Sequence, residues 1–215
     1  MNLTFHTPSG IEGESMRIIQ QELEDMGITL EADCVDVVRR AIHTTADFDY
    51  AKNLVFTPSA AAAGVEALRT GTPIVTDTNM ARSGINQKAC TQLGVERFCY
   101  MADSEVAQAA QANGTTRAVA AVDRWAQEHP NAIFAVGNAP TALLRMCELM
   151  EAGTLRPSLV IAVPVGFVNV VESKEAMLEL CNKLEIPAIV AMGRKGGSTV
   201  AAAICNALLY RTFER

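Results

Sequence analysis

Six short apolar runs alternate along the chain with segments of helical pattern, and this alternation constrains the fold more than any other feature. An uninterrupted apolar run of four or five residues is typical of a strand buried on both faces, as in parallel sheets. Strands that alternate with helices form such sheets through right-handed crossovers. The sequence therefore predicts an α/β fold of three layers, with a mainly parallel sheet between helices. The runs are residues 53–56, 73–76, 97–100, 132–136, 159–163 and 188–192.

The helical segments carry start and stop signals. Pro58 and Pro140 stand at expected first helical positions, Thr57 is the expected cap before Pro58, and Gly71 follows the expected end of that helix. Helices are expected at residues 10–27, 34–42, 57–71, 104–114, 115–130, 139–153, 172–187 and 196–213. The expected core contacts of the first helix are Ile11, Ile18, Ile19 and Leu23.

Composition limits the classes of protein to which the chain can belong. With 215 residues, of which 49% are hydrophobic and 20% charged, the chain fits a single domain, residues 1–215, with a large core. A net charge of −6 without a basic run, together with 5% aromatic residues, argues against nucleic acid as a partner. No signal peptide and no bilayer-spanning apolar segment is evident, so we expect a cytoplasmic protein without a membrane partner. The six cysteines form no Cys-x-x-Cys pair and are expected to be reduced, buried thiols.

Basic side chains stand near several expected helix N-termini, where the helix dipole disfavours them. Arg117 follows two threonines at one helix start, Lys174 follows Ser173 at another, and Arg194 and Lys195 precede the last helix. Ligands of doubly wound sheets bind between strand ends and helix starts, so these cations together predict a site for an anionic small molecule. Scattered exposed charge is the alternative explanation for each of them taken singly.

Glycine and asparagine mark the same kind of connection elsewhere. Gly137 permits close approach of the backbone, and Asn138 can cap the next helix or reach a ligand, although a tight turn explains both equally well. The stretch GRKGGST (193–199) differs from a phosphate loop because Lys195 precedes the two glycines. A nucleotide-dependent transferase is therefore a weak alternative.

His43 stands where the helix at 34–42 is expected to end, preceded by Arg39 and Arg40 and followed by two aspartates. Arginine neighbours lower the pKa of an imidazole, whereas carboxylates and a helix C-terminus raise it. An imidazole under such opposing influences is readily tuned for general acid or base catalysis. A lone histidine is more often structural, and the helix dipole alone explains His129 at another helix end.

Seven stretches that span nearly the whole chain carry the strongest functional signal: GIEGESMRII, VVRRAIHTTADFDYA, GTPIVTDTNM, GTTRAVAAV, VGNAPTALL, VPVGFVNVVESKEAM and GRKGGSTVAAAICNALL. In their residues and in their order along the chain, they resemble the precorrin-8X methylmutase family of cobalamin biosynthesis. The resemblance implies an isomerase that moves a methyl group from C-11 to C-12 of precorrin-8X or cobalt-precorrin-8, giving hydrogenobyrinate or cobyrinate. A non-catalytic carrier of the corrinoid product is the alternative.

The resemblance also implies roles for single residues. His43 corresponds to the family's catalytic histidine, which would protonate or hydrogen-bond a ring nitrogen, and Ser15 and Arg40 correspond to substrate-contacting residues. Met16 stands where the family has an aromatic residue, which puts only local packing in doubt. No cofactor and no metal is implied, because the methyl group never leaves the substrate, and the family resemblance implies a homodimer with the ring near its interface. The carboxylate-rich substrate would explain the cations, so the further expected binding residues are Arg117, Asn138, Lys174, Arg194 and Lys195.

Overall fold

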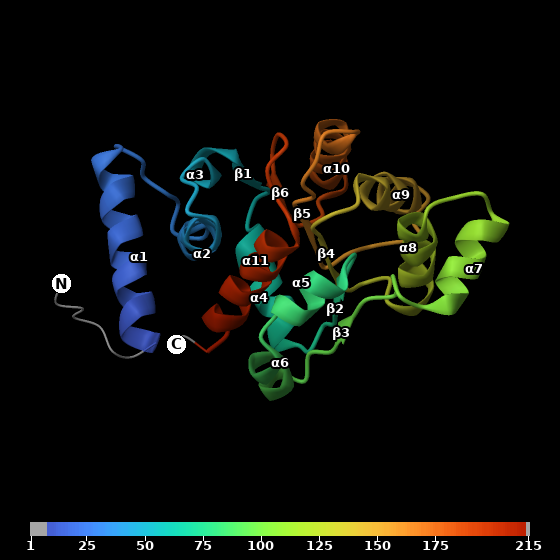
Figure 1. Ribbon diagram of the computed structural model, residues 1–215, viewed down its shortest axis with the longest axis horizontal. Coiled ribbons are helices and arrows are strands. Elements are labelled where there is room, and N and C mark those ends of the chain that lie inside the picture. The colour runs from blue at the N-terminus through green and yellow to red at the C-terminus, as the bar shows by residue number, and fades with distance from the viewer. Residues whose placement is uncertain (1–7, 214–215) are drawn as a thin grey trace.

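A six-stranded sheet forms the middle layer, with the strand order β1-β6-β5-β4-β2-β3 (Figure 1). The computed structural model describes residues 8–213. β1 runs antiparallel to β6, and the other described strand pairs are parallel, which confirms the expected single α/β domain with a mainly parallel sheet. The strands are β1 (Leu54–Phe56), β2 (Ile74–Thr76), β3 (Arg97–Phe98), β4 (Ile133–Val136), β5 (Leu159–Ala162) and β6 (Ala188–Ala191).

All six predicted strands are present, each a residue or two shorter than its apolar run. Successive side chains of a strand point to opposite faces, and here both faces are covered. In β4, Ile133 and Ala135 belong to one buried cluster, whereas Phe134 and Val136 belong to the other. The continuous apolar run therefore reflects burial on two sides.

Two groups of helices cover the sheet. One face carries α2 (Val35–Thr45), α4 (Ala60–Arg69), α5 (Asn79–Gly84), α6 (Gln87–Leu93) and α11 (Ser198–Arg211), with α1 (Pro8–Asp25) packed on α2. The other face carries α7 (Ser104–Ala112), α8 (Arg117–Glu128), α9 (Pro140–Glu151) and α10 (Val170–Leu184). The short helix α3 (Tyr50–Asn53) leads into β1. In Figure 1, α1 and α7 lie at opposite ends of the molecule.

Two expected helix starts are wrong. α4 begins at Ala60 rather than at Pro58, because Ser59 adopts a left-handed conformation with φ 59° just before it. The hydroxyl of Thr57 accepts a hydrogen bond from the N–H of Ala188 at 2.8 Å instead of capping the helix. α10 begins at Val170, so Lys174 lies beyond the first turn.

The first helix is less buried than its pattern predicts. Ile19 and Leu23 are buried, as expected, but Ile11 and Ile18 are 53% and 44% exposed. The helix rests mainly on α2, so only one narrow side of it reaches the core.

The described cysteines are free thiols; three are buried and three are partly buried. Across residues 8–213, none of the helices combines the length and the apolar character that crossing a membrane would require.

The connections that follow β2, β4 and β6 meet at one edge of the sheet. A Cβ atom on Gly137, after β4, would lie 2.7 Å from Cα of Ser198 at the start of α11. The hydroxyl of Thr78, after β2, lies 2.8 Å from that of Ser198. The segment after β6 therefore reaches past the end of β5 and contacts the connections that follow β4 and β2.

We expect Gly137→Ala to lower the free energy of unfolding by about 1–3 kcal/mol, because the new methyl group would overlap backbone atoms that cannot rotate away. Gly13→Ala is the matched control, since a Cβ atom there has nothing within 4 Å and alanine favours the helix. Urea denaturation of both variants measures the difference. Equal stability of Gly137→Ala and the wild type would contradict the close packing.

Candidate active site

The carboxylate of Asp77, directly after β2, closes the start of α9. Asp77 is 1% exposed. Its Oδ1 accepts the N–H of Gly137 at 2.9 Å, and its Oδ2 accepts those of Asn138 and Ala139 at 2.7 and 2.8 Å. Burial raises the pKa of Asp77, against the three N–H donors, which favour the charged form. The protein's own carboxylate thus occupies the anion position that a helix N-terminus offers. Sequence reasoning missed Asp77, although an acidic residue directly after a buried strand was a usable signal.

The connection after β6, residues 192–197, is held against the end of β5. A Cβ atom on Gly196 would lie 2.1 Å from the carbonyl oxygen of Val163, so a larger residue does not fit there. The N–H of Gly197 donates to the same oxygen at 2.8 Å, and the N–H of Gly166 donates to the carbonyl of Arg194 at 3.3 Å. The backbone of this connection is therefore fixed at several points.

Lys174 reaches this connection from inside the protein. Its side chain is fully buried, and Nζ donates to the carbonyl oxygens of Gly193 and Lys195, both at 2.8 Å. Burial lowers the pKa of Lys174 to about 8. The ammonium group therefore supports the backbone after β6, which is a different placement from the solvent-facing cation that the sequence suggested.

Lys195 joins the connection after β6 to the segment that follows α2. Its Nζ lies 2.6 Å from Oδ2 of Asp47 and 2.6 Å from Oδ2 of Asp49. The hydrogen bond from Lys195 lowers the pKa of Asp47, and the two carboxylates raise the pKa of Lys195. Because β1 is antiparallel to β6, the segment before β1 lies at the edge where β6 ends, which makes this ion pair possible.

His43 lies in the last turn of α2, just before that segment. The helix continues to Thr45, and Ala46 ends it in a left-handed conformation with φ 53°. The side chain of His43 is exposed, and within residues 8–213 it makes no hydrogen bond or ion pair. The imidazole is therefore available to a substrate.

Ser15 and Arg40 lie on the adjacent helices α1 and α2. Nη1 of Arg40 pairs with Oε1 of Glu12 at 2.5 Å, and its guanidinium carbon lies 5.0 Å from the ring centre of Tyr210. The hydroxyl of Ser15 donates to the carbonyl of Ile11 at 2.8 Å, inside α1. A small cavity of about 180 Å³ between α1, α2 and α11 is lined by Arg40, among others. Both side chains are thus engaged within the protein.

The remaining predicted residues, Arg117, Asn138 and Arg194, are exposed at or before the starts of helices. Arg117 is the first residue of α8, and the hydroxyl of Thr116 lies 3.4 Å from that of Thr141, which puts this helix start beside that of α9 and the exposed Asn138. Arg194 lies with its guanidinium carbon 5.4 Å from the ring centre of Phe167. Neither arginine forms an ion pair in the part of the chain that the structure describes.

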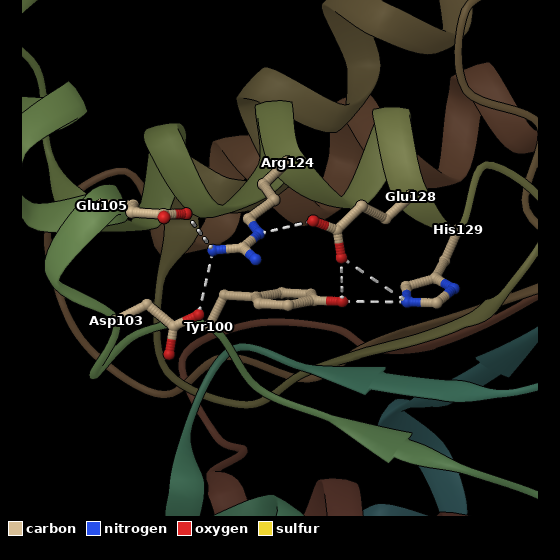
Figure 2. Close-up of polar contacts among 6 residues, drawn as sticks. All are labelled: Tyr100, Asp103, Glu105, Arg124, Glu128 and His129. Carbon is tan, nitrogen blue, oxygen red and sulfur yellow. Dashed lines mark hydrogen bonds and ion pairs between the residues drawn. The ribbon is translucent and has the colours of Figure 1, made fainter.

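A second polar cluster surrounds Tyr100 (Figure 2). The phenol of Tyr100 donates to Oε2 of Glu128 at 2.7 Å, and Nε2 of His129 lies 2.9 Å from the phenol oxygen of Tyr100. His129 also stacks on Phe98 with ring centres 4.2 Å apart, and the structural interpretation of this histidine stays a prediction. Arg124 pairs with Glu128 and with the carboxylates of Asp103 and Glu105, which are drawn in Figure 2.

A cavity of about 640 Å³ adjoins this cluster between α7, α8 and α9, but its chemistry does not suit a polyanion. Its two arginines, Arg124 and Arg145, are already paired with carboxylates. Three acidic residues line it as well: Glu105, Asp123 and Glu128. We therefore place the candidate site at the sheet edge. Within residues 8–213 there is no group of three or more His, Cys, Asp or Glu side chains that could hold a metal ion.

The fold and this edge define a doubly wound α/β protein whose strand ends carry an imidazole and guanidinium groups that have no ion-pair partner within residues 8–213. The family model for precorrin-8X methylmutase matches residues 10–211. The chain therefore belongs to the precorrin-8X methylmutase family, whose members are isomerases of cobalamin biosynthesis.

Individual relatives agree with this assignment. The chain is 41% identical to the cobalt-precorrin-8 methylmutase of Priestia megaterium, over 94% of this chain and 87% of that protein. It is 34% identical to the precorrin-8X methylmutase of Pseudomonas aeruginosa, over 91% of both chains. A crystal structure of precorrin-8x methyl mutase from Thermus thermophilus superimposes with a TM-score of 0.84 at 40% identity, covering 94% of this chain and 96% of that one.

We expect the stability of the protein to depend on the protonation of Lys174. Its pKa is about 8 in the folded protein against the ordinary 10.5, so between these values the folded protein binds fewer protons than the unfolded chain. Stability from this group therefore rises with pH across that window. Relative to Lys174→Met, the free energy of unfolding of the wild type should rise by about 1–3 kcal/mol as the pH increases from about 8 to 10.5. Urea denaturation at several pH values tests this, and parallel pH profiles for the two proteins would contradict it.

Proposed function

We propose that this protein moves the methyl group from C-11 to C-12 of precorrin-8X or cobalt-precorrin-8, forming hydrogenobyrinate or cobyrinate. Relatives that carry either name support the reaction. The observation that carries the role of His43 is its exposed imidazole, which has no polar partner in the described part of the chain and lies beside the segment that Lys195 fixes at the strand ends. A comparison of kcat/KM on the metal-free and the cobalt-containing ring would separate the two substrates.

The proposed chemistry needs one proton donor and a firmly held ring. Protonation of a ring nitrogen, or a hydrogen bond to it, withdraws electrons and favours the tautomer from which the methyl group migrates. A positioned acid contributes about 10²–10⁴-fold to such a step. The remaining acceleration would come from orientation of the ring. The methyl group leaves one carbon and joins another in the same molecule, so His43 returns to its starting state.

The carboxylates of the ring would bind to the exposed cations at the same edge. Arg117 and Arg194 carry guanidinium groups without an ion-pair partner among the described residues, and Asn138 lies beside the start of α8. Phe167 is 81% exposed next to Arg194 and offers an apolar surface to the flat ring. Ser15 and Arg40 would join the site if the Arg40–Glu12 pair opens for a substrate carboxylate.

A homodimer is also part of the proposal. Ile11 and Ile18 on α1, and Val168 beside Phe167, are apolar and exposed. Such side chains gain stability when a second copy covers them. The open edge of one chain would then become an enclosed site for a wide, flat ligand.

We expect His43→Ala to lower kcat by about 10²–10⁴-fold, because the proton donor is lost. Its free energy of unfolding should change by less than about 0.5 kcal/mol, since the side chain of His43 is exposed and forms no hydrogen bond or ion pair with residues 8–213. The change in substrate absorbance, followed with catalytic amounts of enzyme, measures turnover, and titration with product should show that binding survives.

The neighbouring Thr44 is also exposed, so Thr44→Ala is the matched control and should turn over like the wild type. Full activity of His43→Ala would remove the imidazole from the mechanism. A wild-type reaction that stops after one equivalent would indicate the carrier instead of an enzyme.

We expect Arg194→Gln and Arg117→Gln each to raise KM about tenfold with little change in kcat, because a charge-assisted hydrogen bond to a peripheral carboxylate contributes roughly 1.5–3 kcal/mol. Arg69→Gln is the control, since Arg69 is an exposed arginine that lies shortly before the start of β2, away from the strand ends. Steady-state kinetics at low salt give both constants. Unchanged KM in both variants would exclude these arginines from the binding site.

A further inference from the structure

We propose that Lys174 is a positioning residue for the methyl shift: it holds the backbone after β6 so that Lys195 fixes the segment at 45–49, which follows His43. The inference rests on the proposed role of His43 in catalysis. It assigns to Lys174 and Lys195 an action through the protein in place of direct contact with substrate carboxylates.

The first step is the burial of a charged amine. Burial of an ammonium group is unfavourable unless hydrogen bonds compensate for the lost water. Lys174 is 0% exposed, and its two described acceptors are the carbonyls of Gly193 and Lys195. An apolar side chain would be accommodated at lower cost but could not donate to these two carbonyls, so the amine is required to hold them.

The second step is the stiffness of the connection itself. Residues on both sides of Lys195 are bound to the segment after β5: the carbonyl of Arg194 accepts from Gly166, and Gly197 donates to Val163. Because Lys174 also binds the carbonyls of Gly193 and Lys195, the Cα of Lys195 has little freedom to move. Its side chain therefore leaves the backbone at a defined point.

The third step is the engagement of Lys195. Two carboxylates, those of Asp47 and Asp49, each lie 2.6 Å from its Nζ. An ammonium between two carboxylates is already neutralised, so it offers little attraction to a substrate carboxylate. Exposed ion pairs contribute little to stability, which means that this contact acts mainly on geometry.

The fourth step is the transfer of position to His43. The hydroxyl of Thr45 donates to the carbonyl of Ala41 at 2.8 Å and accepts the N–H of Asp47 at 3.3 Å. Oδ1 of Asp47 also accepts the N–H of Asp49 at 3.0 Å. The segment at 45–49 is thus bonded both to itself and to the last turn of α2. A carboxylate held by Lys195 therefore sets where the turn that carries His43 lies.

The test compares Lys174→Met with Lys183→Met, which removes an exposed lysine from the same helix. Misplacement of a reacting group by about 1 Å can lower the rate by about 10²-fold. We expect Lys174→Met to lower kcat by about 10- to 100-fold while KM changes by less than about threefold. Lys183→Met should match the wild type. Hydrogen exchange of the amides in residues 43–53 should be faster in Lys174→Met alone, and this readout does not depend on activity.

A second set of variants separates positioning from substrate binding. If Lys195 bound the substrate, Asp47→Asn/Asp49→Asn would free it and leave KM equal or lower. The proposal instead predicts that this double variant and Lys195→Met lose kcat to the same degree, without a large change in melting temperature. Lys174→Met/Lys195→Met should be no worse than the single variants, because both act on one path.

The possible failures are distinguishable. Wild-type kcat and wild-type exchange in Lys174→Met, or full kcat in Asp47→Asn/Asp49→Asn, would overturn the proposal. If Lys174→Met does not fold, the exposed Lys195 and aspartate variants still decide it. A wild-type protein without multiple turnover would refute the proposed function, while the exchange data would still report whether Lys174 controls the segment after His43.

Discussion

Two buried charges that have no side-chain counterion in the described range 8–213 organise the edge of the sheet at which the strands end. The carboxylate of Asp77 is satisfied by three N–H groups at the start of α9, and the ammonium of Lys174 by two carbonyls after β6. Each charge thus binds backbone groups. Asp77 binds the connection after β4, and Lys174 binds the connection after β6. Because an unpaired buried charge is strongly unfavourable, these connections cannot move without a large loss of free energy. The result is a stiff frame with little polar capacity left for a ligand.

The groups that remain free are therefore the ones exposed on this frame. His43, Arg117 and Arg194 lack ion-pair partners among the described residues, whereas Lys195 and Arg40 have them. A net charge of −6 does not prevent the binding of a polyanion, since the field of a few unpaired guanidinium groups dominates at short range. The frame and the free groups have different energetic roles: the first resists movement, and the second retain their attraction for a substrate.

Much of the fold was predictable because burial on both faces leaves an uninterrupted apolar run, and each such run became a strand. The direction of β1 was not, because a short buried run looks the same in either direction. The environment of Lys174 was also hidden: after Asn169, in a left-handed conformation, the helix starts two residues earlier than its pattern suggested, and this places the lysine deeper in the protein. Local sequence shows that a cation follows Ser173, but only tertiary packing decides whether it faces water or two carbonyls.

The reversed direction of β1 has a consequence for chemistry as well as for topology. Leu54 at the start of β1 pairs with Ala191 at the end of β6, and the N–H of Met192 donates to the carbonyl of Asn53 at 2.8 Å. A parallel β1 would have placed the end of α2 at the opposite edge, far from the helix starts that carry the cations. The antiparallel strand brings the imidazole of His43 to the edge that the parallel units build. Since that imidazole belongs to a segment outside those units, its position depends on the contacts between the two, which include the β1–β6 pairing and the ion pair of Lys195 with Asp47 and Asp49.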